Sequence, residues 1–141
     1  MPVKPEAALY RRMTAQMSGC LFTRIESRVG LGIPDVLIGF KNRGFALVEL
    51  KVVRRGRQVR LSPHQISFHM RHAEHGCPSY ILVLHAPIGR RVHECELMLY
   101  GGEQAMRLYE GGIDVNPLAR WNWAEVQWEM LKGILTGDVA L

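Results

Sequence analysis

Three charged residues stand on two short apolar segments in the first half of the chain. Residues 32–40 carry Asp35, and residues 45–51 end with Glu49 and Lys51. Both segments are rich in β-branched and aromatic residues, and the turn-forming residues 41–44 between them predict a β-hairpin. Strands this apolar are expected to be buried, and buried charges are normally paired or bound to a metal. The hairpin is therefore the first candidate for a functional site.

The spacing of the three residues predicts how they meet. Glu49 and Lys51 are two residues apart, so they point to the same face of a strand. If the turn centres on Asn42, Asp35 stands directly across from Glu49, with Cβ atoms about 5 Å apart. Two carboxylates this close repel each other unless a proton or a cation lies between them. A two-residue turn at Asn42 and Arg43 would instead put Asp35 on the opposite face.

A hard divalent cation such as Mg²⁺ suits a site built from one or two carboxylates. Held by Asp35 and Glu49, it would polarise a phosphate oxygen and lower the pKa of a bound water. Lys51 would orient that water or offset the negative charge that develops on the phosphoryl group. The alternative is a structural ion pair between Lys51 and one of the carboxylates. The apolar flanks and the shared strand face favour the metal site.

The composition indicates a globular protein with an anionic partner. The 141 residues are most simply one domain, and 48% of them are hydrophobic. The net charge of +5 and the pI near 9.4 favour a polyanion such as nucleic acid. Three widely spaced cysteines argue against a disulfide framework, and neither a signal peptide nor a membrane span is recognisable. We therefore expect a soluble cytoplasmic protein, with neither a membrane nor a small organic cofactor among its partners.

Hydrophobic periodicity and capping residues predict an α/β fold. Helices are expected over residues 5–18, 63–75 and 103–109 and from Asn116 onward, and strands over residues 21–27, 32–40, 45–51, 80–84 and 94–100. The helix that starts after Ser62 joins two apolar strands, which predicts a crossover between parallel neighbours in a mixed sheet. The expected order is α-β-β-β-α-β over about residues 5–86, followed by a C-terminal extension of a strand and helices over residues 87–141.

The two charged segments also resemble a known family. Pro34-Asp35 followed by Glu49-Leu50-Lys51 resembles the motif of the PD-(D/E)XK, or restriction-endonuclease-like, nucleases. With residues 61–65 (Leu-Ser-Pro-His-Gln) included, the pattern is most similar to the virus-type replication-repair nucleases and the archaeal Holliday-junction resolvases. The resemblance covers about residues 5–86. It implies the restriction-endonuclease-like fold and Mg²⁺-dependent DNA hydrolysis, with Mn²⁺ as a substitute.

Two further site residues follow from the resemblance, each with an alternative. Gln65 would lie near the catalytic lysine, yet Ser62 and Gln65 also have the spacing of a helix capping box. Many relatives carry an extra acidic metal ligand upstream of the proline-aspartate pair. Glu26 is the preferred candidate because it is closer to the motif, and Glu6 in the first helix is the alternative. Glu26 could equally be an exposed charge paired with a neighbouring arginine.

The remaining candidate residues would contact DNA or stabilise the fold. Arginines at positions 54, 55, 57 and 60 follow the Glu49 strand, where they are expected to contact the phosphate backbone (Arg54, Arg55, Arg57 and Arg60). His64 and His69 are expected to point outward near the DNA. Histidines at three-residue steps, His69, His72 and His75, do not have the spacing of a helical zinc pair. The three tryptophans, all within residues 121–128, suggest core or dimer packing.

These observations predict a metal-dependent DNA endonuclease, with Holliday-junction cleavage suggested by the resemblance. Relatives that cut four-way junctions work as dimers, so a homodimer is expected. The alternatives are cleavage of flaps, nicks or single strands on the same fold, or a DNA-binding module without turnover. A protein that binds partners through its tryptophan-rich C-terminal region is a third possibility. The small size and the resemblance suggest a phage or mobile-element enzyme of DNA repair or recombination.

Overall fold

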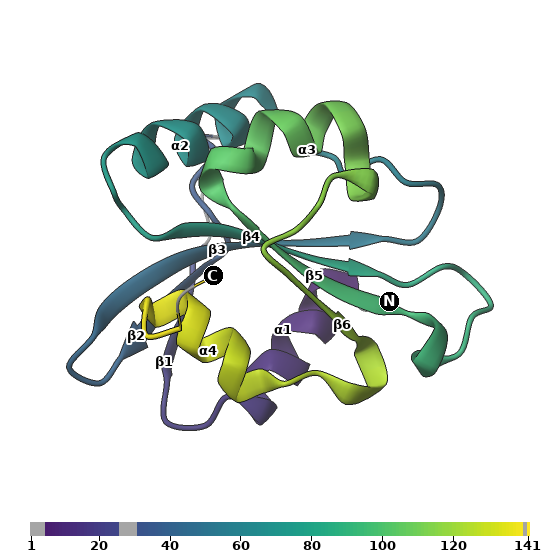
Figure 1. The fold of residues 1–141 in the computed structure, drawn as a ribbon, viewed down its shortest axis with the longest axis horizontal. Coiled ribbons are helices and arrows are strands. Elements are labelled where there is room, and N and C mark those ends of the chain that lie inside the picture. The colour runs from purple at the N-terminus through teal and green to yellow at the C-terminus, as the bar shows by residue number, and fades with distance from the viewer. Residues whose placement is uncertain (1–4, 26–30, 140) are drawn as a thin grey trace.

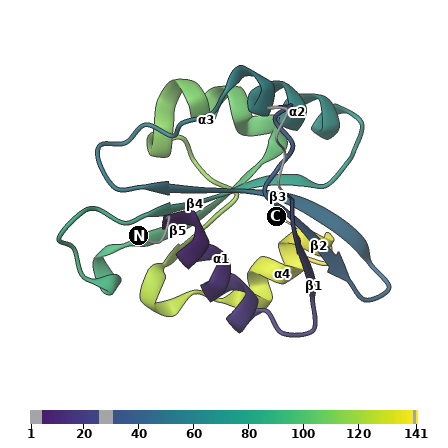
Figure 2. The same cartoon turned by 180° about the vertical axis from the view of Figure 1, so that it is seen from behind.

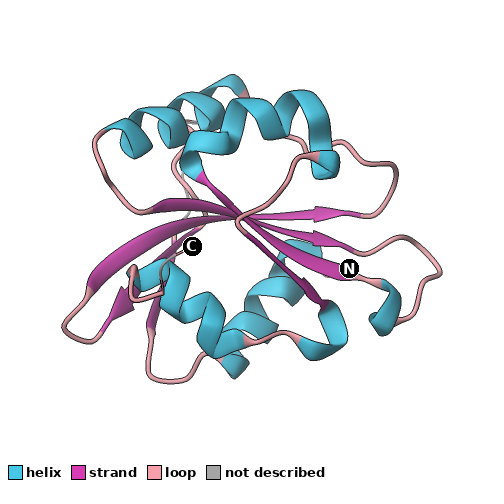
Figure 3. Ribbon diagram, viewed as in Figure 1, coloured by secondary structure: helices cyan, strands magenta, loops and turns pink. Residues whose placement is uncertain are grey.

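The computed structural model describes residues 5–25, 31–139 and 141. Over these residues the chain forms an α/β fold in which a mixed, open sheet of six strands lies between two layers of helices (Figure 1, Figure 3). We call the layer of α2 and α3 the upper layer and that of α1 and α4 the lower layer, as Figure 1 draws them. Figure 2 shows the same two layers from behind.

The elements follow the predicted order through the fourth strand. The helices are α1 (Pro5–Gln16), α2 (Pro63–Glu74), α3 (Ala105–Gly111) and α4 (Trp128–Thr136); the strands are β1 (Leu21–Arg24), β2 (Val36–Phe40), β3 (Gly44–Val53), β4 (Ser79–His85), β5 (Glu96–Gly101) and β6 (Ala119–Asn122). The strands lie in the sheet in chain order, and only β3 and β4 are parallel neighbours. The predicted crossover through α2 is therefore confirmed.

The register of the hairpin is the one that a turn centred on Asn42 predicts. Val36 pairs with Val48 and Phe40 with Gly44, which leaves a three-residue turn. Asn42 has φ 62° and Gly44 φ 74°, in the left-handed region that asparagine and glycine adopt most readily. The turn residues thus set the register, and the two-residue turn does not form.

The sheet separates two hydrophobic cores. The lower core joins α1 and α4 to one face of β3, where Ala46, Val48 and Leu50 are at most 1% exposed. The upper core lies under α2 and α3 and includes Ile66 and Leu108. Because side chains alternate along a strand, Glu49 and Lys51 stand on the upper face, between the sheet and α2.

The C-terminal region differs from the prediction. Asn116 and Pro117 were expected to open a helix, but the residues after them form β6, which pairs with β5. Trp121 stands opposite Leu97 and enters the lower core, so the exposed edge of β5 is covered by a strand rather than a helix. The last helix begins only at Trp128. Over the described residues, no helix has the length and apolar character needed to cross a membrane.

Candidate active site

Asp35 and Glu49 meet where β2 begins. The register that pairs Val36 with Val48 places the preceding Asp35 across from Glu49, on the upper face. The backbone N–H of Leu50 donates to Asp35 Oδ2 over 2.9 Å, which fixes this carboxylate against β3. The two carboxylates are therefore held together by the strand pairing itself.

Glu49 is a buried carboxylate with an unused oxygen. Its side chain is 2% exposed, and its Oε1 is buried without a hydrogen-bond partner. Burial, hydrogen bonding with Asp35 and the charge of Asp35 raise the pKa of Glu49 to about 9, and Lys51 only partly opposes them. An unpartnered buried charge is costly, so this position takes up either a proton or a cation.

Lys51 and the start of α2 are joined through one side chain. Lys51 Nζ donates to Gln65 Oε1 over 3.2 Å, and the same Oε1 accepts from the backbone N–H of Ser62 over 3.0 Å. The Gln65 backbone N–H donates to Ser62 Oγ over 3.1 Å and completes the capping box. The capping role of Gln65 therefore does not exclude the position beside Lys51 that the resemblance implies.

A glycine brings the loop before Asp35 against α2. Gly32 has φ 76°, and a Cβ at this position would collide with the backbone of His64 and Gln65. Only glycine allows so close an approach in this left-handed conformation. The contact sets the distance between the hairpin that carries Asp35 and the helix that carries Gln65.

One of the two candidates for the extra acidic residue, Glu6, lies within the described residues. Glu26 lies outside the described residues, so its position is not assigned. Glu6 lies in the first turn of α1, and α1 packs against β3. Burial is the main cause of the raised pKa of Glu49, and the charge of Glu6 adds to it. Glu6 therefore lies close enough for its charge to act on Glu49.

The arginines after β3 border a basic hollow of about 510 Å³ next to the site. Arg54, Arg55 and Arg60 line it together with Lys51 and Glu6. All four arginines of this segment are exposed, but Arg57 does not line the hollow. Instead it forms an ion pair with Asp114 at 2.7 Å, together with a hydrogen bond of the same length. Three of the four arginines are thus brought together beside Lys51.

The prediction that His69 points outward is wrong. Its side chain is fully buried on the inner side of α2, where that of Ile66 is also buried. Its Nδ1 lies 2.6 Å from Ser79 Oγ, and its Nε2 has no partner.

Burial lowers the pKa of His69 to about 4, and the charges of His72 and Lys51 contribute, so the ring is neutral at pH 7. Among the described residues, Glu49 Oε1 and His69 Nε2 are the two buried side-chain polar atoms without a partner. The sequence pattern did not reveal this buried histidine, because a histidine in an apolar stripe carries no distinctive spacing.

The donor set limits what the site can hold. In the described part of the chain, no three His, Cys, Asp or Glu side chains come close enough to form a metal site. Asp35 and Glu49 supply two carboxylates, and Oε1 of Glu49 is buried without a hydrogen-bond partner. This fits a hard cation such as Mg²⁺, which binds one or two carboxylates and keeps water or phosphate oxygens as its other ligands.

Comparison with protein families, with curated proteins and with solved structures finds no match to this chain. The resemblance to nucleases therefore depends on the motif residues alone.

Proposed function

We propose that the chain is a metal-dependent DNA endonuclease with a restriction-endonuclease-like arrangement of its core. The observation that carries the proposal is the buried, unpartnered Oε1 of Glu49 across from Asp35. A folded protein tolerates such a group where it serves a ligand, because burying it costs stability. The α-β-β-β-α-β order and the parallel pairing of β3 and β4 support the same proposal.

Each residue of the site has a role in this reaction. Asp35 and Glu49 would hold Mg²⁺ or Mn²⁺, which supplies polarisation of the phosphate and activation of water when bound. Lys51, held by Gln65, places a positive charge where negative charge develops on the phosphoryl group. Glu26 stays the preferred candidate for the extra acidic residue that the resemblance implies, because Glu6 does not form a three-ligand group with Asp35 and Glu49. Hydrolysis then yields one phosphate monoester end and one hydroxyl end.

The basic hollow explains how DNA would be held. Arg54, Arg55 and Arg60 border Lys51 without ion-pair partners among the described residues, so their charges are free for phosphates. Contacts to phosphates give affinity without sequence readout. We propose on this basis a nuclease that recognises the structure of DNA rather than its sequence.

The substrate and assembly remain part of the proposal. The resemblance to junction resolvases favours four-way junctions and a homodimer, whose two sites would make two symmetric cuts. Flap, nick or single-strand cleavage on the same fold is the alternative. The tryptophans offer little for a partner: Trp121 lies in the lower core, and Trp123 and Trp128 pack against it and each other at 6.0 Å. A repair or recombination role in a phage is suggested by the resemblance.

A DNA-binding module without turnover is the second candidate. The buried carboxylate of Glu49 across from Asp35 and the contact of Lys51 with Gln65 speak against it, because a module without chemistry has no need to bury a carboxylate.

Cleavage of labelled DNA tests the proposal. The substrates are four-way junction, flap, nicked, duplex and single-stranded DNA with Mg²⁺ or Mn²⁺, and the proteins are wild type, Glu49→Gln and Glu125→Gln. Glu125 is exposed, so the last variant controls for loss of a carboxylate. We expect metal-dependent cutting by wild type and Glu125→Gln and none by Glu49→Gln. Cutting that survives Glu49→Gln, or no cutting on any substrate, would overturn the proposal.

A further inference from the structure

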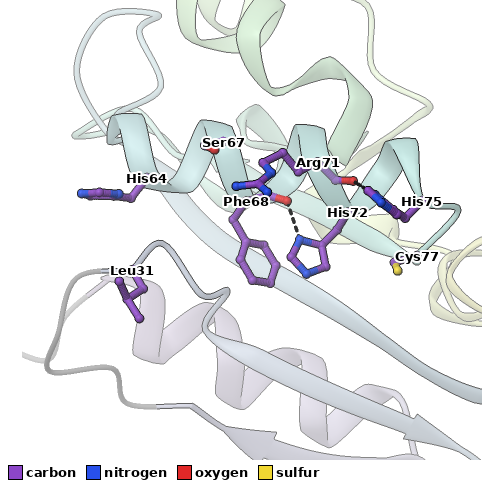
Figure 4. A pocket seen from close by; sticks show the side chains of 8 residues that line it. All are labelled: Leu31, His64, Ser67, Phe68, Arg71, His72, His75 and Cys77. Atoms are coloured by element: carbon purple, nitrogen blue, oxygen red, sulfur yellow. Dashed lines mark hydrogen bonds between the residues drawn. The ribbon is translucent and has the colours of Figure 1, made fainter.

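A second hollow, of about 640 Å³, runs along the outer side of α2. Its lining comes from Leu31 and from the exposed face of α2 and the turn after it: His64, Ser67, Phe68, Arg71, His72, His75 and Cys77. Figure 4 shows Phe68 and His72 pointing from the helix into the space beside Leu31. We call this hollow the α2 groove. It is distinct from the basic hollow, which shares none of these residues.

The centre of the α2 groove is a fixed pair of flat rings. Phe68 and His72 are stacked with ring centroids 3.8 Å apart and planes 19° apart. His72 Nδ1 lies 2.7 Å from the Phe68 carbonyl oxygen, which holds the histidine ring in place (Figure 4). Neither ring is fully buried, and both line the groove. A held aromatic surface open to solvent can accept another flat ring at little entropic cost.

The charges around the rings match a nucleic-acid strand. The lining includes Arg71, which is exposed, and no acidic residue. Leu31, exposed to more than half of its area, adds apolar surface on the opposite wall. Proteins that hold single strands combine basic residues, which follow the phosphates, with aromatic rings, which stack on bases. A protein partner of ordinary composition would explain the apolar surface but not the absence of acidic residues.

The α2 groove begins beside the candidate active site. Its residue His64 directly precedes Gln65, whose amide holds Lys51. Its residue Leu31 directly precedes Gly32, which touches the His64 backbone and leads to Asp35. The site therefore borders the basic hollow through Lys51 and adjoins the α2 groove through the neighbours of Gln65 and Gly32. A strand whose phosphate lies at Glu49 can continue into the groove.

We propose that the α2 groove binds unpaired nucleotides of the DNA strand, with a base stacked on Phe68. This inference rests on the proposed function, because it assigns the strand that enters the same site. A base in a duplex is covered by its neighbours, so only an unpaired base can lie flat on the Phe68 ring. The groove thus selects DNA with unpaired bases next to the position of cleavage, which favours the flap or single-strand alternative over a fully paired four-way junction.

Binding of two oligonucleotides with equal charge tests the stacking. Fluorescence anisotropy in EDTA compares single-stranded oligothymidylate with an abasic strand of the same length. The proteins are wild type, Phe68→Leu, Phe68→Trp and Tyr109→Leu. Phe68→Leu keeps an apolar side chain, Phe68→Trp keeps a ring, and Tyr109 is an exposed ring on α3 that serves as the matched control.

We expect wild type, Phe68→Trp and Tyr109→Leu to bind the thymidylate strand roughly tenfold more tightly than the abasic strand. Phe68→Leu is expected to bind both strands equally. Equal affinity of wild type for the two strands would overturn the inference, even if the protein cuts DNA. A base preference without cleavage on any substrate would support base binding in the α2 groove and overturn the proposed nuclease activity. Self-association of the wild type that Phe68→Leu abolishes, without a base preference, would make the groove an interface between copies of this chain.

Discussion

The two faces of β3 are both buried, but one carries apolar side chains and the other carries a polar cluster. On the lower face Ala46, Val48 and Leu50 are apolar and closed into the core between α1 and α4. On the upper face Glu49 is equally buried but keeps an unpartnered oxygen, and Lys51 reaches the start of α2. The same strand thus serves stability on one side and holds a costly polar cluster on the other. We propose that the polar cluster at Glu49 and Lys51 serves a ligand, because it brings no evident gain in stability.

Shortening a lower-face side chain should have the largest effect on stability. Leu50 is 1% exposed, and Leu50→Ala is expected to lower the free energy of unfolding by about 3–5 kcal/mol through lost burial and a cavity. Denaturant unfolding measures the change. The folded fraction of Leu50→Ala should cut DNA as fast as wild type. Slower cutting per folded molecule would show that the lower face also contributes to cleavage.

Removing the upper-face ammonium should reverse that pattern. Lys51→Met is expected to slow cleavage by about 10²–10³-fold, because positive charge near the phosphoryl group is lost, with little change in the unfolding midpoint. Lys41→Met, an exposed lysine in the hairpin turn, is the matched control. Equal rates for the two variants would remove Lys51 from the chemistry.

The dependence of stability on pH should expose the cost of Glu49. Its pKa is raised from 4.5 to about 9 in the folded state, so the folded protein binds more protons and loses stability as pH rises between these values. His69 acts in the opposite sense: burial lowers its pKa to about 4, so its contribution is lost as pH falls below 6.5.

Between pH 7 and 9, Glu49 changes its protonation on folding and His69 does not, so of these two residues Glu49 alone alters the free energy of unfolding. Wild type should lose up to about 1 kcal/mol per pH unit relative to Glu49→Gln in metal-free buffer. Denaturant unfolding of both proteins at each pH measures the difference, in which the contributions of all other titrating groups cancel. Parallel pH profiles would show that Glu49 is not held in its protonated form.

The smallest predicted effect separates the two functions of Gln65. Ser62→Ala removes the cap oxygen and should cost about 1 kcal/mol of stability while cleavage continues, because Gln65 can still hold Lys51. Gln65→Leu should cost a similar amount and also slow cleavage. If Ser62→Ala slowed cleavage as much as Gln65→Leu, the cap and the lysine contact could not be treated as separate.

The sequence predicted the parts of this site that depend on local rules. Asn42 and Gly44 fix the hairpin register, and the register brings Asp35 to Glu49; Ser62 and Pro63 fix the start of α2 and with it Gln65. These are short-range preferences of turns and caps.

The parts that depend on tertiary packing were not predictable in the same way. The burial of His69 depends on how α2 lies over Ser79, and the approach of Glu6 depends on how α1 crosses β3. The pairing of β6 with β5 outweighed the helix-opening signal of Asn116 and Pro117, because covering an open strand edge satisfies a row of backbone groups.

Titration of Mg²⁺ or Mn²⁺ into the protein tests the central claim. The claim is that Asp35 and Glu49 form a cation site and that Glu49 is protonated when no cation is bound. Calorimetry at pH 7 in two buffers of different ionisation enthalpy reports the protons released on binding. We predict that wild type releases about one proton per bound cation and that Glu49→Gln binds weakly and releases none. Absence of binding to wild type, or binding unchanged in Glu49→Gln, would contradict the account.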